Sequence, residues 1–354
     1  MATETIDPAQ AYENKLIARL EPLHKLTAND DSDVQKFYRG STVFMTGGSG
    51  FLGKQLIEKL LRATTISKMF VLLRCKKGKS IDRRLRDMLE DPVFDTVRNL
   101  KPNFAEKIIP VSGDVGELRL GLSEKDWNTI TEQVDIIFHM AATTRFDEPI
   151  RVATLINLRG SREALLLGKA CKKLRSYIHV STAFSHACMD KVDTPVLEEF
   201  YETPIDPNVM IKMVETVEEE RLNNITPSLI KHWPNTYTFA KALAEELVNT
   251  MSDDLPVCIV RPAIVVASAR EPVPGWVDMS CIYGTSGMLL AGTIGAVHVL
   301  HSDNKRTLDF IPVDYVNNAI IAAGWNTVSD KPVAEGKKIK IYTITPFSRS
   351  PQTM

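Results

Sequence analysis

Residues 43–56 read VFMTGGSGFLGKQL, and this stretch decides the fold. A short apolar run leads into glycines spaced GxxGxxG, and a helix-forming stretch follows. At such a strand–helix junction, glycine lets a pyrophosphate approach backbone N–H groups where the helix dipole also favours an anion. The last glycine also allows close helix–strand packing. The junction therefore predicts a dinucleotide cofactor, with these residues at the loop: Gly47, Ser49, Gly50, Phe51, Leu52 and Gly53.

Five further apolar runs follow, and helical or polar stretches separate them. They lie at residues 68–74, 107–115, 134–142, 175–183 and 256–265. They are apolar along their whole length, which is typical of strands buried on both faces. The pattern predicts an α/β fold with a Rossmann-type doubly wound parallel sheet.

The same pattern predicts the domain organisation. We expect a polar arm over 1–35 with a short helix at 10–26, and a dinucleotide-binding Rossmann domain over 36–265 with a loop and helix insertion at about 187–234. A smaller substrate-binding lobe is expected over 266–354, with Asp314 as the N-cap of a helix over 315–322.

Bulk composition excludes several functional classes. The net charge of −1 gives no basic excess for nucleic acid. The five cysteines are scattered without a CxxC pair, which favours a reducing, intracellular compartment and argues against a disulfide framework or a zinc site. The charged N-terminal stretch is unlike a signal peptide.

One uncharged stretch raises the question of a membrane. Residues 282–300 carry no formal charge over 19 residues, a length that could just span a bilayer. Four glycines dilute its hydrophobicity, and no basic cluster flanks it. We expect a buried or pocket-lining segment, with a membrane-facing segment as the alternative.

The end of the second predicted strand indicates which cofactor binds. An NAD site normally has an acidic residue about 20 residues beyond the glycines. Here Arg74 stands 21 residues after Gly53, and CKKGK follows. A guanidinium suits the 2′-phosphate of NADP, so NADPH is the expected cofactor. The alternative for this cluster, above all for Lys76 and Lys77, is a solvated basic loop.

Two more strand ends fit a cofactor groove. In SGDV, Asp114 and Val115 are expected at the cofactor, with the Asp114 carboxylate on the adenine amino group. In FHMAATTRF, Ala141 and Ala142 are small enough for a ribose to lie against the backbone. His139, inside the preceding apolar run, is interpreted as a packing residue.

The ordered motifs TGGSGFLG, SGDV, HMAA, STA, YTFAK and VRPAIV resemble the extended short-chain dehydrogenases/reductases over about residues 40–325. The blocks TTRFDEPI, REPVPGWVDM and LDFIPVDYVNN, with the glycine loop, resemble the fatty acyl-CoA reductases in particular. The resemblance implies NADPH-dependent reduction of long-chain acyl-CoA to fatty alcohol, through an aldehyde that usually stays bound. It also suggests the endoplasmic reticulum membrane or the peroxisome. The oligomeric state stays open.

Within this resemblance, the pair Tyr237 and Lys241 predicts the catalytic group. Residues four apart share one helix face, and a neighbouring ammonium should lower the pKa of the phenol. Tyr237 would then donate a proton to an oxygen that gains charge. The family implies that Lys241 also reaches the nicotinamide ribose, and that Thr182 of STA contacts the same oxygen. Ser181 and Ser185 are weaker alternatives to Thr182.

The remaining expectations concern the pocket and its rivals. Pro262 and Ile264 should bound the nicotinamide pocket. Cys188 is the nearest candidate for a covalent acyl-enzyme, although a structural buried cysteine is the commoner case. Rival functions are another NADP-dependent extended reductase, a sugar-nucleotide epimerase, which Arg74 disfavours, and a truncated non-catalytic NADPH-binding isoform.

The C-terminal sequence TITPFSRSPQTM stops where family members usually continue into a further domain. The expectation is a short isoform or a fragment, with any membrane attachment through a segment that this sequence lacks.

Overall fold

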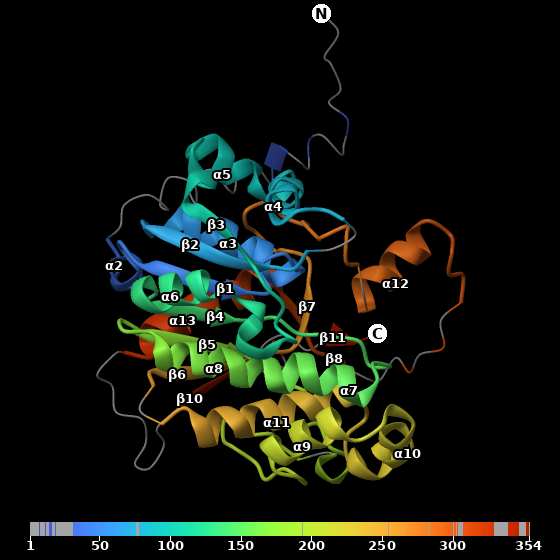
Figure 1. Cartoon of the computed structure of the whole chain (residues 1–354). Coiled ribbons are helices and arrows are strands. Elements are labelled where there is room, and N and C mark those ends of the chain that lie inside the picture. Colours follow the sequence, from blue (N-terminus) through green and yellow to red (C-terminus); the bar gives the residue numbers. More distant parts are fainter. Residues whose placement is uncertain are drawn as a thin grey trace, which may run out of the picture.

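A parallel sheet of seven strands forms the centre of the described part of the molecule (Figure 1). The computed structural model describes residues 31–346 except 76–77, 193, 254, 283, 300, 302, 304–306 and 329–338, together with 352–353 and isolated residues between 7 and 18. The helix expected at 10–26 lies almost entirely outside the described residues, as do Lys76 and Lys77.

The strand order is β10-β6-β5-β4-β1-β2-β3, and every pair is parallel. The strands are β1 (Thr42–Thr46), β2 (Lys68–Leu73), β3 (Ile108–Ser112), β4 (Ile136–His139), β5 (Ser176–Val180), β6 (Val257–Pro262) and β10 (Lys340–Ile344). This is the doubly wound order of a Rossmann fold, as the sequence predicts. The order reverses between β1 and β4, so a crevice for a ligand is expected at their carboxyl ends.

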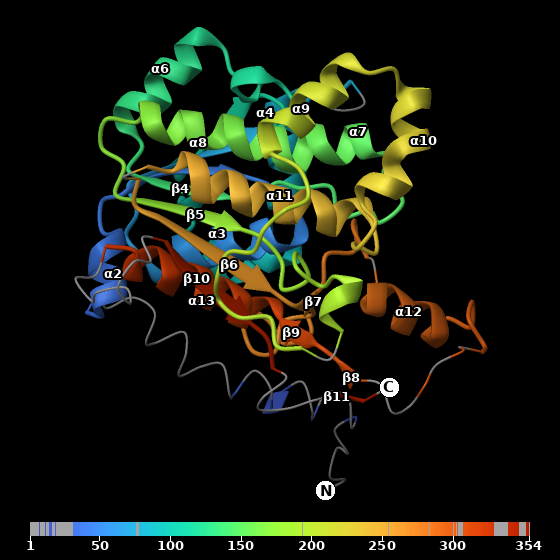
Figure 2. The same cartoon turned by 90° about the horizontal axis from the view of Figure 1, so that it is seen from below.

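Helices cover both faces of the sheet (Figure 2). One face carries α2 (Asp33–Tyr38), α3 (Phe51–Ala63), α4 (Ile81–Leu89), α5 (Asp95–Leu100) and α13 (Val313–Asn326). The other carries α6 (Glu124–Gln133), α8 (Gly160–Ala170), α9 (Pro207–Thr216) and α11 (Thr236–Met251). Successive strand side chains point to opposite faces. In β1, Val43 and Met45 enter one core and Phe44 the other, which explains the continuous apolar runs.

Short elements connect these layers. The helical ones are η1 (Pro92–Phe94), η2 (Phe104–Lys107), η3 (Leu118–Gly121), α7 (Ile150–Ala153), the π-helix η4 (Thr154–Arg159), η5 (Met189–Lys191) and α10 (Glu219–Leu229). Two small strand pairs lie beside the main sheet: β7 (Ile264–Val266) with β9 (Phe310–Pro312), and β8 (Thr307–Leu308) with β11 (Gln352–Thr353).

The stretch 266–354, expected as a smaller lobe, also completes the main body. Its β10 pairs with β6 in the sheet, and its α13 packs against α3 and β5. The expected N-cap role of Asp314 is wrong, because α13 begins at Val313 after Pro312. The buried Asp314 carboxylate instead accepts hydrogen bonds from the backbone N–H groups of residues 269, 270 and 271.

The expectation that the uncharged stretch 282–300 is buried is wrong for its described residues, whereas a pocket-lining role stays a prediction. This stretch forms α12 (Gly284–Thr293), which has no buried residue and stands at the periphery in both views (Figures 1 and 2). Leu289 and Ile294 are 69% and 70% exposed. Apolar composition alone does not show whether another part of the molecule covers a segment. No helix in the described residues combines the length and the apolar character needed to cross a membrane.

Candidate active site

The glycine loop lies at the carboxyl end of β1, and its conformation requires glycine. Gly47 has a φ of +77°, and a Cβ on it would stand 2.7 Å from the backbone nitrogen of Ala141. A Cβ on Gly53 would stand 2.3 Å from the Gly47 carbonyl oxygen. Gly50 is the N-cap residue of the 13-residue helix α3. The loop therefore presents free backbone N–H groups of a helix N-terminus, the arrangement that fits a pyrophosphate.

The other predicted loop residues lie at the start of α3. Ser49, Phe51 and Leu52 are half-buried there. The Phe51 ring stacks on Trp276 at a centroid distance of 5.2 Å, and the Leu52 carbonyl accepts a hydrogen bond from Asn317. Trp276 comes from REPVPGWVDM, a block that pointed to the family but gave no sign of contact with this loop.

The structure brings Arg74 and Asp114 together at the ends of β2 and β3. Arg74 Nη1 lies 3.6 Å from Asp114 Oδ2, and Asp114 Oδ1 accepts a hydrogen bond from Gly116 N. Both side chains are at least one-third exposed, so this ion pair adds little to stability and leaves both groups accessible to a ligand. Val115 is buried instead, with its side chain against Gly160.

Arg84 is a further cation at this edge that sequence analysis missed. Its guanidinium donates to the Arg74 carbonyl oxygen, so α4 brings a second positive charge beside the end of β2. Nothing in the sequence distinguishes Arg84 from Arg83 or Arg86, because all three occur in one charged helix.

His139 joins the ends of β1 and β4. Its Nδ1 lies 2.9 Å from Thr46 Oγ1, and that hydroxyl also accepts from Met140 N and Ala141 N at 3.2 Å each. The buried ring is thus a structural link, in line with the packing interpretation. It holds the backbone that leads to Ala141 and Ala142, both half-buried, against the glycine loop.

Tyr237 lies in the first turn of α11, and Thr182 follows β5 beside it. The helix begins there because the Asn235 side chain caps it, accepting from Thr238 N at 2.9 Å. Thr182 is buried, and an interaction with its side-chain hydroxyl acts to lower the pKa of the Tyr237 phenol. Pro262, at the end of β6, has its carbonyl oxygen 3.5 Å from Thr182 Oγ1. Ile264 follows, half-buried on β7.

The alternatives to Thr182 are placed differently. Ser181 Oγ is buried and has no hydrogen-bond partner among the described residues. Ser185 Oγ donates to the Glu245 carboxylate at 3.0 Å. Of Ser181, Thr182 and Ser185, Thr182 is the residue whose hydroxyl affects the pKa of Tyr237.

The expected lowering of the Tyr237 pKa is wrong for this structure. Burial raises the pKa of Tyr237 to about 12, and the hydrogen bond with Thr182 opposes that rise. The Lys241 ammonium instead donates to the Val180 carbonyl oxygen at 2.8 Å. Burial lowers the pKa of Lys241 to about 8, and the Glu245 charge opposes the fall. Tyr237 is therefore fully protonated at neutral pH and is available as a donor.

Glu245 continues the same helix face one turn beyond Lys241. It is fully buried, and its carboxylate accepts from Arg261 Nη2 at 2.6 Å and lies 3.0 Å from His186 Nε2. Arg261 also donates to two carbonyl oxygens of the segment that follows Thr182, those of Leu197 and Glu199. Sequence analysis missed this network, although the spacing of four from Lys241 was a signal for it.

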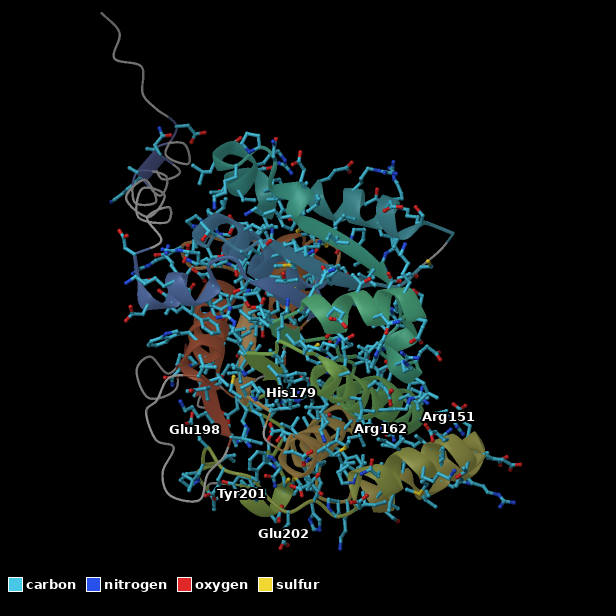
Figure 3. The ribbon with its side chains drawn as sticks, turned by 60° about the vertical axis from the view of Figure 1, so that its left-hand side comes forward. Arg151, Arg162, His179, Glu198, Tyr201 and Glu202 are labelled. Atoms are coloured by element: carbon cyan, nitrogen blue, oxygen red, sulfur yellow. The ribbon has the colours of Figure 1, made fainter. Side chains whose placement is uncertain are left out.

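Figure 3 labels two aromatic side chains from the surroundings of α11, His179 and Tyr201. His179, on β5, lies in the interior, where it stacks on His139 at 5.6 Å. Burial, with the charge of Lys241, lowers the pKa of His179 to about 3, so the ring is neutral. Tyr201 lies on the segment after Thr182, with its ring 4.9 Å from that of His186.

Cys188 does not have the properties of a nucleophile. It is buried, and burial raises the pKa of its thiol to about 11. The thiolate needed for attack is therefore scarce at neutral pH. Among the described residues, no group of three or more His, Cys, Asp or Glu side chains could hold a metal ion.

Comparison with known families identifies the chain. The family model described as "Male sterility protein", an NAD-binding model, matches residues 45–320. The chain belongs to this family. The matched range spans the glycine loop, the ends of β2 and β3, Thr182 and Tyr237.

Curated relatives of this family are similar over most of the chain. It is 40% identical over 302 residues to "Fatty acyl-CoA reductase wat" of Drosophila melanogaster, which covers 85% of this chain and 57% of that protein. It is 38% identical over 319 residues to human "Fatty acyl-CoA reductase 1", covering 90% and 60%. The chain thus spans about 60% of the length of these relatives. The resemblance to fatty acyl-CoA reductases is confirmed.

Solved structures support the fold. The terminal R domain of the myxalamid biosynthetic pathway is 28% identical with a TM-score of 0.59, covering 89% of this chain and 68% of that one. The reductase domain of a Mycobacterium tuberculosis nonribosomal peptide synthetase gives a TM-score of 0.61 at 22% identity, covering 89% and 71%, and shows the fold alone. The family model is that of an NAD-binding domain, and the solved structures share its fold.

Proposed function

We propose that this chain carries the catalytic domain of an alcohol-forming fatty acyl-CoA reductase. It reduces a long-chain acyl-CoA to a fatty alcohol with NADPH, by way of an aldehyde held at the site, and releases CoA. The observation that carries the proposal is the Tyr237–Thr182 contact, with Lys241 one turn along the same helix. The named activity of relatives at about 40% identity supports the substrate class.

The residues present fit the cofactor. The backbone around Gly47 and Gly50 would hold the pyrophosphate, and Lys241 would hold the nicotinamide ribose. Arg74 would take the 2′-phosphate, because a guanidinium pairs with phosphate through two parallel N–H groups. Asp114 would hydrogen-bond the adenine. When bound, NADPH supplies the hydride for both reductions.

The chemistry of the chain's own residues is proton transfer and charge stabilisation. Tyr237 donates its proton to the thioester oxygen as that oxygen gains charge, and the Thr182 hydroxyl donates a hydrogen bond to the same oxygen. Collapse of the resulting hemithioacetal returns a proton to Tyr237 and expels CoA as thiolate, which is protonated by solvent. Tyr237 then protonates the aldehyde oxygen in the second reduction and regains its proton from solvent.

A direct assay tests the proposal. The purified chain is incubated with NADPH and palmitoyl-CoA, and NADPH loss, free CoA thiol and hexadecanol are followed. Turnover should consume two NADPH for each thiol released. NADPH binding without thiol release would refute the activity and favour the rival, a non-catalytic NADPH-binding isoform.

The variant Tyr237→Phe tests the assignment of the proton donor. It should lose at least ~10²-fold in kcat, the usual contribution of a general acid, and should keep its NADPH affinity. Tyr315→Phe is the matched control, because Tyr315 is 41% exposed on α13. Full activity of Tyr237→Phe would show that another group supplies the proton.

The compartment is part of the same proposal. We infer a reducing compartment from the scattered cysteines, and the endoplasmic reticulum membrane or the peroxisome from the family resemblance. Fractionation of cells that express the whole protein tests this placement.

A further inference from the structure

Phe146 is an exposed aromatic side chain beside the proposed proton donor. It is 66% exposed, and its ring centroid lies 6.0 Å from that of Tyr237 with an interplanar angle of 30°. A single exposed hydrophobic residue is ordinary on a protein surface. Its place next to the proposed proton donor Tyr237 is what calls for an explanation.

The loop that carries Phe146 is held at both ends. On one side, the Thr143 backbone N–H donates to Asn157 of η4 at 2.9 Å, and Asn157 donates back to the Thr143 carbonyl at 3.0 Å. On the other, Thr236 Oγ1 donates to the Glu148 carbonyl at 2.8 Å. The Thr143 hydroxyl also donates to the Glu148 carboxylate at 2.7 Å, closing the loop on itself. The backbone on either side of Phe146 is therefore anchored to η4 and α11.

The side chains on either side of Phe146 are turned to each other. Arg145 Nη2 donates to Asp147 Oδ2 at 2.9 Å, so the two charges of this short segment are paired. Between them the loop presents an apolar ring. Thr236, which anchors the loop, is the residue before Tyr237, so the ring and the phenol are positioned by the same turn of α11.

We propose that Phe146 contacts the substrate, with its ring packed on the methylene groups next to the reacting carbonyl. This rests on the function proposed above. A carbonyl oxygen hydrogen-bonded to Tyr237 places the adjoining part of the acyl chain within reach of the Phe146 ring, whose centroid lies 6.0 Å from that of the phenol. Apolar contact there removes methylene and ring surface from water together.

The test uses Phe146→Ala, Phe146→Leu and a matched control. Leu100→Ala is the control, because Leu100 is 47% exposed on α5, on the other side of the molecule from α11 (Figure 1). Substrates are octanoyl-CoA, palmitoyl-CoA and hexadecanal, each with saturating NADPH. A non-reducible thioether, S-hexadecyl-CoA, gives a dissociation constant by calorimetry without any turnover.

We expect Phe146→Ala to raise KM about tenfold for all three substrates and to weaken thioether binding equally, a loss of ~1.4 kcal/mol. Phe146→Leu should recover most of the lost substrate affinity. Neither substitution should change NADPH affinity or Tm. The effect should be equal for the C8 and C16 chains, because the contact is next to the carbonyl.

If KM and thioether binding are unchanged in Phe146→Ala, the inference is overturned. The proposed function still holds in that case as long as the wild type reduces acyl-CoA. An effect on the acyl-CoA substrates without one on hexadecanal would also overturn the inference, because the ring would then contact the CoA arm. A wild type that binds the thioether without reducing acyl-CoA would refute the function alone.

Discussion

Replacing the buried Glu245 by Gln should destabilise the folded protein strongly, although the two side chains have nearly the same volume. Its carboxylate lies between Arg261 and His186, and the three side chains are at most 2% exposed. Glutamine keeps the shape but removes the charge. The Arg261 guanidinium would then be buried without a counter-ion, while it still donates to two backbone carbonyls of the segment after Thr182.

Two routes give the same magnitude. Breaking one side of a buried ion pair costs ~3–5 kcal/mol. Separately, burial acts to raise the pKa of Glu245, but the hydrogen bonds and charges of His186 and Arg261 together hold it at about 2, against an ordinary 4.5. At 1.36 kcal/mol per pKa unit, the difference between 4.5 and about 2 corresponds to ~3 kcal/mol. Net stabilities of domains are ~5–15 kcal/mol, so the loss is a large fraction of the total.

The assay is thermal unfolding followed by circular dichroism at pH 7 and pH 3. A loss of ~3 kcal/mol should lower Tm by about 4 °C at pH 7, since the entropy of unfolding is about 2.1 cal/mol/K per residue. Because the folded pKa of Glu245 is depressed, its stabilisation is present above the unfolded pKa and is lost as pH falls towards 2. The difference in Tm between wild type and Glu245→Gln should therefore be smaller at pH 3 than at pH 7. Glu124→Gln, which removes an exposed partner of Arg119, is the control and should leave Tm unchanged.

A Glu245→Gln protein with the Tm of wild type at pH 7 would refute this account. The Arg261 guanidinium would then have to be satisfied by its two carbonyl partners alone. A gap of the same size at pH 7 and pH 3 would contradict the role of the charge, and would point to hydrogen-bond geometry instead.

Two further predictions concern the cofactor. Arg74→Ala should weaken NADPH binding about 10- to 100-fold, because a hydrogen bond to a charged group contributes ~1.5–3 kcal/mol. NADH binding, measured in the same fluorescence titrations, should not change. An equal loss for both cofactors would place Arg74 away from the 2′-phosphate. NADPH affinity should also fall as pH rises through about 8, where Lys241 loses its proton. Lys241→Arg should move that fall to higher pH in the same titration, and a pH-independent affinity in wild type would contradict a role for the ammonium.

The sheet could be predicted from sequence because burial on both faces leaves a continuous signature. A strand such as β1 needs consecutive apolar residues, since Val43 and Phe44 enter different cores. The glycine loop was equally predictable, because a positive φ at Gly47 and the close approach of Gly53 exclude other residues. In both cases the local sequence alone carries the constraint.

Other features depend on what lies opposite in space, and sequence does not give that. The apolar stretch at α12 has the composition of a core helix yet is exposed, because nothing in its own residues determines a covering element. Asp314 has the pattern of an N-cap, but the backbone of residues 269–271 comes close enough to take its carboxylate. The pKa of Tyr237 likewise depends on a balance of burial and charge that requires distances.

Because they are spaced by four, Tyr237, Lys241 and Glu245 lie on one face of α11, and each is in a different charge state there. Glu245 is fixed as a charge by Arg261 and His186, so it can oppose the effect of burial on Lys241. Lys241 then stays charged at neutral pH, near the point where it would lose its proton. The Tyr237 phenol stays neutral, so it gives up a proton only when an acceptor gains enough charge to draw it. A helix face that keeps its cation charged and its acid neutral is suited to carbonyl reduction, in which charge develops on the oxygen during the reaction.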